Sequence, residues 1–188
     1  MTSLKIKLNS WKKKKEIMIN KNIDCLIENV NDDFEIDVEY WSKIAKKLFQ
    51  NLLTHSEIAQ DCCLVDLKDE FDDVFFDITF TDAKQTHELN KTYREKDYPA
   101  DIITFALFAD SEDKIIVERS VMLGDIIIAL DKVQQMAQEE SKTFEWELKF
   151  LIAHGILHLL GFDHRDEEEY NFVVRHQNLA IEELNDEI

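Results

Sequence analysis

The sequence predicts an α+β fold in a single domain, with a mixed β-sheet of about four strands flanked by helices. The chain has 188 residues, of which 45% are hydrophobic, enough to bury one substantial core. A block of short segments rich in branched and aromatic residues precedes a block with helical periodicity. No internal repeat or Pro/Gly-rich linker divides the chain. We therefore expect one domain over residues 21–188, preceded by a lysine-rich extension over residues 1–20.

The predicted elements follow from local patterns taken in chain order. Four segments have the composition of short strands: 74–80, 101–107, 114–118 and 124–130. Helical spacing or capping residues mark five helices: about 40–52, 82–93, 131–140, 143–160 and 167–184. Asp82 and Thr143 are candidate N-caps, and Gly161 is a candidate C-terminal stop. The C-terminal part is thus predicted to be helical.

Charge and cysteine content limit the function classes. The formal net charge of −18 makes the surface a poor general attractant for nucleic acid or anionic membrane, so a polyanion must meet a local basic patch. The cysteines Cys25, Cys62 and Cys63 form no C-x-x-C pair. No apolar run approaches the roughly 18 residues of a membrane span. These features predict a cytoplasmic protein.

Residues 154–164 read HGILHLLGFDH, which sets three histidines at a spacing that suits one metal ion. A four-residue step turns an α-helix by about 400° and rises about 6 Å, so His154 and His158 project from the same face. Gly161 then ends the helix, and the chain turns back to present His164. Three neutral imidazoles leave one tetrahedral position open, as in catalytic zinc sites. We expect one catalytic zinc ion on these three histidines.

Gly155 sets this motif apart from a related one. The pattern resembles the H-E-x-x-H-x-x-G-x-x-H signature of metzincin peptidases, in which the glutamate is the general base. Gly155 occupies the position of that glutamate and has no side chain that could act. Two interpretations remain open at this stage. The bare glycine makes room for a bulky substrate at the metal, or it lets the helix pack closely against a strand.

A resemblance to a known family rests on three blocks of sequence. Residues 154–164, with aspartate directly before the third histidine, look like the signature of the YbeY endoribonuclease family. Residues 90–107, NKTYREKDYPADIITFAL, resemble that family's segment in which an arginine precedes a Pro-Thr-Asp-Val-Leu-Ser-Phe stretch, and residues 123–126, LGDI, are a third match. Together the blocks place about residues 35–180 within the family. The departures from the pattern are small: Ala100, Thr104 and Ala106.

The resemblance implies a zinc-dependent nuclease that cleaves single-stranded RNA. It also implies work on the ends of small-subunit ribosomal RNA and in ribosome quality control, with the small subunit and proteins of ribosome assembly as partners. By matched position, Arg94 is the family's functionally important arginine. A guanidinium grips phosphate through two parallel hydrogen bonds, and Arg94 stands between Lys91 and Lys96. The residues alone favour a solvated loop arginine paired with Asp97 or Asp101, and the family resemblance reverses that interpretation.

The expected mechanism has zinc polarise a phosphoryl oxygen and supply hydroxide, while Arg94 stabilises the charge of the transition state. Attack by the RNA 2′-hydroxyl remains an alternative, and no general base is visible. Asp163 is either an orienting partner of a metal ligand or a turn residue.

Two other functions stay open at the level of the sequence. One is a metallohydrolase of another class, such as a peptidase; the other is a non-catalytic RNA- or ribosome-binding assembly factor with a structural metal. The remaining histidines lack ligand spacing and are expected on the surface: His55, His87 and His176.

Overall fold

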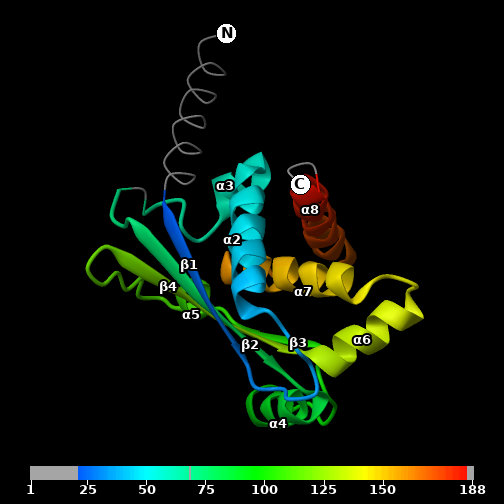
Figure 1. The fold of residues 1–188 in the computed structure, drawn as a ribbon. Helices are drawn as coiled ribbons and strands as arrows, with labels where there is room; N and C mark the ends of the chain where they lie inside the picture. The colour runs from blue at the N-terminus through cyan, green and yellow to red at the C-terminus, as the bar shows by residue number, and fades with distance from the viewer. Residues whose placement is uncertain (1–20, 68, 186–188) are drawn as a thin grey trace.

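A four-stranded mixed sheet organises the part of the chain that the structure, a computed structural model, describes: residues 21–67 and 69–185 (Figure 1). The strands are β1 (Asn22–Asn29), β2 (Asp73–Thr81), β3 (Ile102–Phe105) and β4 (Ser120–Ala129). Their order in the sheet is β1-β2-β4-β3, with β1, β2 and β4 parallel and β3 antiparallel to β4. The predicted α+β class with a mixed sheet is confirmed. The predicted extension, residues 1–20, lies outside the described residues.

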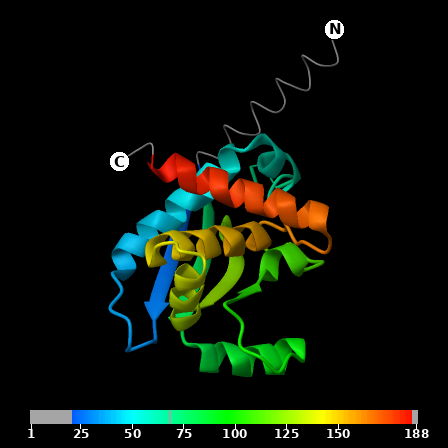
Figure 2. The ribbon, with the colours of Figure 1, turned by 90° about the vertical axis from the view of Figure 1, so that its right-hand side faces the viewer.

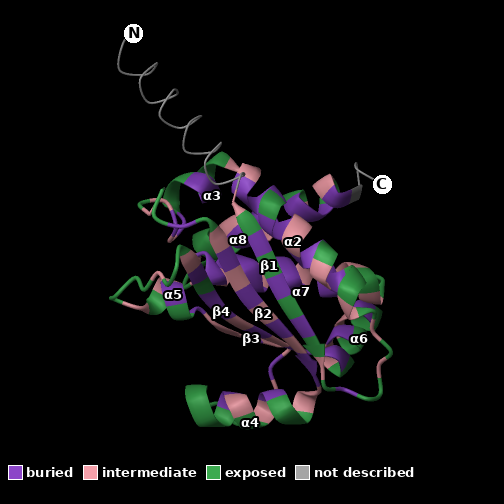
Figure 3. Cartoon of the chain, turned by 60° about the vertical axis from the view of Figure 1, so that its left-hand side comes forward, coloured by how far each residue is buried: buried purple, intermediate pink, exposed green. Residues whose placement is uncertain are grey.

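Helices cover one face of this sheet in two layers (Figure 2). The helices are α2 (Val38–Thr54), α3 (Ser56–Asp61), α4 (Ala83–Arg94), α5 (Leu107–Asp110), α6 (Leu130–Glu139), α7 (Phe144–Leu159) and α8 (Glu167–Asn185). Helix α2 packs on β1, α7 packs on β3 and β4, and α8 lies over both helices. At one end of the sheet, α4 packs against β3 and β4 (Figure 3). This arrangement places α7 in the middle of the molecule.

The central position of α7 follows from its sequence. Ten of its residues are buried, including Leu148, Ile152 and Ile156 on successive turns. A helix that is apolar on most of its circumference must be covered on most sides, here by the sheet below and α8 above. None of the helices in the described residues combines the length and apolar character that a bilayer span requires. The helix is therefore a rigid base for any side chain it carries.

Strand β1 was not predicted. Its alternate residues Ile23, Cys25 and Ile27 are buried against the helices, but Leu26 is 69% exposed between them. The resulting run of apolar residues hides the two-residue period by which a half-buried strand is recognised. What fixes β1 is its parallel pairing with β2, fifty residues away.

The predicted strand at residues 114–118 is wrong. Ile115 and Val117 are 67% and 63% exposed, and neither belongs to a strand. Glu118 and Arg119 both have positive φ, and Val117 pairs only with Ser120 across them. The segment is thus a tight turn leading into β4. Because β1 was missed and the strand at 114–118 was wrongly predicted, the expected total of about four strands still agrees with the structure.

Gly124 lets β3 and β4 come together. The register between β2 and β4 shifts after Phe75, and both Leu123 and Gly124 on β4 are buried there, which is a β-bulge. Gly124 has φ of 138°, and a Cβ on it would lie 1.9 Å from the carbonyl oxygen of Phe105. Only glycine fits this approach. The bulge sets the orientation of the part of β4 that supports α7.

Candidate metal centre

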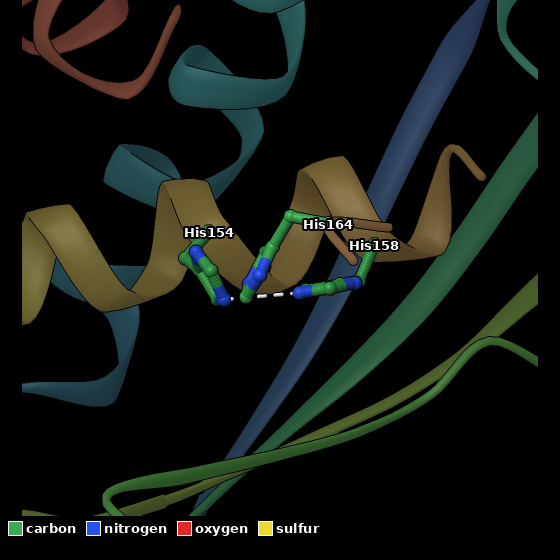
Figure 4. A group of neighbouring side chains, drawn as sticks. All are labelled: His154, His158 and His164. Atoms are coloured by element: carbon green, nitrogen blue, oxygen red, sulfur yellow. Dashed lines mark hydrogen bonds between the residues drawn. The ribbon is translucent and has the colours of Figure 1, made fainter. Parts of the chain in front are cut away.

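Three histidines converge at the C-terminal end of α7 (Figure 4). One ring nitrogen from each of His154, His158 and His164 lies within 4.8 Å of those of the other two. The Nε2 atoms of His154 and His158 are 2.9 Å apart, and the ring of His164 is centred 5.3 Å from each of the other two rings. The spacing in the sequence thus brings the three side chains together, and the group could hold a metal ion.

The two ends of α7 explain this convergence. At the start, the Thr143 hydroxyl accepts a hydrogen bond of 3.1 Å from the Trp146 amide, as an N-cap does. At the end, Gly161 has φ of 95° and donates to the His158 carbonyl, while Phe162 donates to the Leu157 carbonyl. This pair of bonds is a Schellman motif, which ends the helix and reverses the chain. The reversal carries His164 back to the helix.

Burial keeps two of the three histidines, His154 and His158, in the form that binds metals. It lowers the pKa of His158 to about 4, and the neighbouring His154 and His164 rings act in the same direction. Burial is also the main cause that lowers the pKa of His154. Because neutral imidazole is the form that donates to a metal, these two residues are ready to act as ligands at neutral pH.

Gln177 of α8 orients His154, a contact that the sequence did not reveal. Its Oε1 lies 3.3 Å from His154 Nδ1, and its Nε2 donates to the Phe150 carbonyl at 3.0 Å. Gln177 is fully buried, so both contacts are held in a fixed geometry. An Nδ1–H that donates to Gln177 leaves the Nε2 lone pair facing the other histidines. No spacing rule links residues 154 and 177, which come from different helices.

Asp163 serves mainly the turn. Its Oδ1 accepts a 2.8 Å hydrogen bond from the amide of His164, which is the largest cause of its lowered pKa. The same oxygen is 3.8 Å from Nδ1 of His158, which is too long for a hydrogen bond. Asp163 therefore supports His158 through its charge and fixes the backbone of His164.

Arg94 borders the same pocket as the histidines. A cavity of about 700 Å³ is lined by His154, His158 and His164 and by the cationic residues Arg94, Lys96 and Arg165. The charge of Arg94 is close enough to contribute to the lowered pKa of His158. The pocket thus brings a guanidinium and the histidine cluster together from segments sixty residues apart in the sequence.

The guanidinium of Arg94 is not used by an internal ion pair. Asp97, one of its proposed partners, instead lies 2.8 Å from His87 and 3.4 Å from Lys91. The other, Asp101, accepts from its own neighbour's amide. Among residues 21–67 and 69–185, the Arg94 side chain forms no hydrogen bond or ion pair with the protein. The interpretation of Arg94 as a paired loop arginine is therefore not supported.

The loop that follows Arg94 is tied to α4 by two buried polar side chains. Thr86 donates to the Ala100 carbonyl at 2.7 Å, and Asn90 donates to the Tyr98 carbonyl at 2.9 Å. Glu95 ends α4 in the left-handed region, with φ of 58°. These bonds hold the end of α4 against the start of β3 and so fix the position of Arg94.

Gly155 faces the sheet. A Cβ at this position would lie 2.8 Å from both Cδ1 and Cγ2 of Ile126 on β4. Gly155 is buried and is not part of the pocket lining. The structure thus supports close packing of helix on strand, and the interpretation that its bareness makes room for substrate is wrong.

The expectation that the other histidines lie on the surface is wrong for two of them. His176 is 2% exposed, and its Nδ1 lies 2.8 Å from Nδ1 of His55, whose side chain is 9% exposed. His87 is more exposed, and its Nε2 lies 2.8 Å from the carboxylate of Asp97. The pair of His55 and His176 joins α8 to the end of α2 and lies outside the pocket lining.

Comparison with known proteins places these features in a family. The family model described as endoribonuclease YbeY matches residues 26–185. Proteins named endoribonuclease YbeY from Bacillus thuringiensis (strain Al Hakam), Bacillus cereus (strain AH187) and Bacillus anthracis (strain A0248) are each 41% identical over 108 residues, covering 56% of this chain and 69% of the relative. The solution structure of TM1509 from Thermotoga maritima is 26% identical, covers 88% of this chain and 93% of that one, and has a TM-score of 0.48. With the matched region spanning the sheet, the histidine cluster and α8, the chain belongs to the endoribonuclease YbeY family.

Proposed function

We propose that the protein is a zinc-dependent endoribonuclease specific for single strands. It acts in the maturation of small-subunit ribosomal RNA ends and in ribosome quality control, in the cytoplasm. The observation that carries the proposal is the pocket that joins three imidazoles to an arginine whose side chain is not paired within the described part of the chain. Membership of an endoribonuclease family supports the reaction class. The ribosomal substrate rests on the resemblance of the sequence motifs to that family.

The histidine cluster fits a zinc ion. Zinc bonds to imidazole nitrogen at about 2.0–2.1 Å, so two ligands in a tetrahedron lie roughly 3.3 Å apart. The observed 2.9 Å between the Nε2 atoms of His154 and His158 needs little adjustment. When bound by His154, His158 and His164, zinc would supply a Lewis acid beside the scissile phosphate and would acidify a water molecule. Neutral imidazoles also suit copper and nickel, so zinc is the proposal and metal analysis its check.

Arg94 would bind the scissile phosphate. Its planar guanidinium offers two parallel N–H donors to the phosphate oxygens, and these bonds strengthen as negative charge grows in the transition state. Because the side chain is not tied to a carboxylate of the described chain, RNA does not have to displace an internal partner. Lys96 and Arg165 line the same pocket and add positive charge for the neighbouring phosphates.

The recessed position of the cluster favours single strands. His154 and His158 are half-buried on the central helix, so a phosphate must enter the pocket to reach them. A flexible strand can enter with its bases splayed, whereas a rigid duplex is held at the rim. The formal net charge of −18 opposes RNA elsewhere on the surface, so we expect weak binding of free RNA and stronger action when ribosomal partners position the strand.

Cleavage of a labelled single-stranded RNA by zinc-loaded protein tests the proposal. Arg94→Ala should lower the cleavage rate by about 10²–10³-fold, the usual cost of losing one donor to a developing charge. Chelated protein, and the same RNA annealed to its complement, should give little cleavage. The matched control is Arg175→Ala, because Arg175 pairs with Glu57 outside the pocket. Equal cleavage by the Arg94→Ala and wild-type proteins at equal metal content would exclude the proposed role.

A further inference from the structure

One face of α7 lines the pocket along its whole length. Glu147, Leu151, His154 and His158 follow one another at steps of four, three and four residues, and all four line the cavity. Glu147 lies seven residues before His154, which is about 10 Å along the helix axis. The pocket therefore extends from the histidine cluster toward the start of α7, beyond the space that a phosphate alone would fill.

Glu147 is an unusual residue to find at that end. It is 1% exposed, yet within residues 21–67 and 69–185 no hydrogen bond reaches its carboxyl group, and its Oε2 is fully buried. Burial raises the pKa of this carboxyl group; Lys142 opposes the effect, and Glu140 and Asp101 add to it. A buried polar atom without a partner costs about 1–3 kcal/mol of folding free energy. The first turn of α7 favours a negative charge at this position, but within the described residues no donor meets Oε2, so the carboxyl group can still accept a hydrogen bond from a group outside the protein.

The surroundings of Glu147 differ from those of Arg94. Ile102, Phe150 and Leu151 provide an apolar and aromatic wall. The charged groups that act on Glu147 are Lys142, which is paired with Glu140 at 2.6 Å, and the acids Glu140 and Asp101. One ammonium against three carboxyl groups, Glu147 included, makes this end of the pocket acidic on balance, which disfavours phosphate. This end offers instead an apolar surface for a flat ring and acceptors for hydrogen-bond donors at the edge of that ring.

We propose that the Glu147 end of the pocket is a nucleobase subsite that prefers bases carrying an exocyclic amino group, such as adenine and cytosine, over uracil. The base stacks along the apolar wall, and its amino group donates to the carboxyl group of Glu147, which lines the pocket. Uracil presents a carbonyl oxygen where adenine and cytosine present the amino group, and that oxygen would face Asp101 and Glu140. The proposal rests on the proposed function, since it assumes that the phosphate of the same nucleotide sits near Arg94 and the histidines.

Binding of short homopolymers to metal-free protein tests the subsite separately from cleavage. In chelator and at low salt, fluorescence anisotropy should show oligo(A) and oligo(C) binding about five- to tenfold tighter than oligo(U), the effect of one net hydrogen bond. Glu147→Leu should lower the affinity for oligo(A) and oligo(C) to that for oligo(U) and leave oligo(U) unchanged. Glu182→Leu, the same change of charge at an exposed position of α8, should keep the preference.

Thermal unfolding distinguishes a ligand-binding carboxyl group from a structural one. Leucine replaces an unpartnered buried polar group, so the Glu147→Leu protein should melt at the wild-type temperature or above it. A midpoint lowered by several degrees would assign Glu147 to the fold and overturn the subsite. Equal affinity of the wild type for all three homopolymers, or a preference that survives in Glu147→Leu, would also overturn it. Failure of the wild type to cleave RNA would count against the proposed function only, because these measurements contain no metal.

Discussion

Two groups of buried histidines in this protein look alike at short range. The Nε2 atoms of His154 and His158 are 2.9 Å apart, and the Nδ1 atoms of His55 and His176 are 2.8 Å apart. Burial is the main cause that lowers the pKa to about 4 for both His158 and His176. The proximity and the neutral state of two imidazoles are therefore not what distinguishes a metal centre.

Their surroundings distinguish them. The pair of His55 and His176 is bordered by carboxylates, with Glu183 3.4 Å from His55 and Glu57 3.4 Å from His176. The cluster at the end of α7 has a third imidazole, that of His164. The neutral amide of Gln177 contacts His154, and all three histidines line the pocket. We call His55 and His176 the closed pair, because they have acidic neighbours and join two helices. We call His154, His158 and His164 the open triad, because they face a pocket and can accept a metal and a substrate. The comparison predicts that equivalent substitutions in the two groups have different effects.

The largest expected difference is in metal affinity. Loss of a residue that orients a ligand costs 10–100-fold in affinity, so loss of a ligand itself in His158→Ala should cost more than about a hundredfold. His55→Ala, in the other group, should bind zinc like the wild type. Competition with a chromophoric chelator measures both. Parallel losses in the two variants would mean that the metal is not held by the triad.

A smaller loss is expected from Gln177, which lies one residue beyond His176 on α8 but serves the other group. Gln177→Leu removes the acceptor for His154 Nδ1 and should weaken zinc binding about 10–100-fold. Gln177→Glu keeps an acceptor at this position and should recover most of the affinity. The neighbouring variant Asn178→Leu is the control.

Nitrogen NMR of the His154 ring separates orientation from a general disturbance of the fold. In the wild type, Nδ1 should carry the proton, and in Gln177→Leu the ring should populate both tautomers. An unchanged tautomer combined with weaker metal binding would contradict the role assigned to Gln177.

Local rules were sufficient for much of the site. Asp82 and Thr143 cap their helices as predicted, and Gly161 ends α7 in the left-handed region. Such features involve neighbours within four or five residues, for which spacing and residue type carry the information. The convergence of the three histidines combines two such features, the four-residue step from His154 to His158 and the turn at Gly161. The seven-residue spacing also predicts that Glu147 lies on the same face of α7 as His154. It does not predict that the carboxyl group of Glu147 lacks a hydrogen-bond partner.

Features that depend on distant partners could not be read from the sequence. Gln177 meets His154 across 23 residues, and His176 meets His55 across 121, without any common pattern. The role of Gly155 was ambiguous because the side chain that excludes a Cβ there, Ile126, belongs to another element, β4. The segment 114–118 has the composition of a strand, but its pairing among the described residues is limited to one bridge, from Val117 to Ser120. Each of these outcomes is set by tertiary packing that overrides or completes the local signal.

An effect that involves the pair of His55 and His176 alone concerns stability in acid. The folded-state pKa of His176, about 4, lies below the ordinary value of 6.5 because of burial, His55 and Arg175, while Glu57 opposes them. As the pH falls below 6.5, the unfolded chain takes up a proton that the folded chain refuses. The stabilisation is therefore fully present above pH 6.5 and is lost progressively down to about pH 4.

In metal-free protein, this single group should contribute up to about 1.4 kcal/mol per pH unit to the loss of unfolding free energy. His176→Leu should reduce the slope between pH 6.5 and 5 by about that amount, as urea denaturation at several pH values would measure. Asn178→Leu, on the same helix without a titrating group, should keep the wild-type slope. A slope unaffected by His176→Leu would mean that His176 is protonated in the folded state, next to Glu57, and that the closed pair is a charged contact between helices.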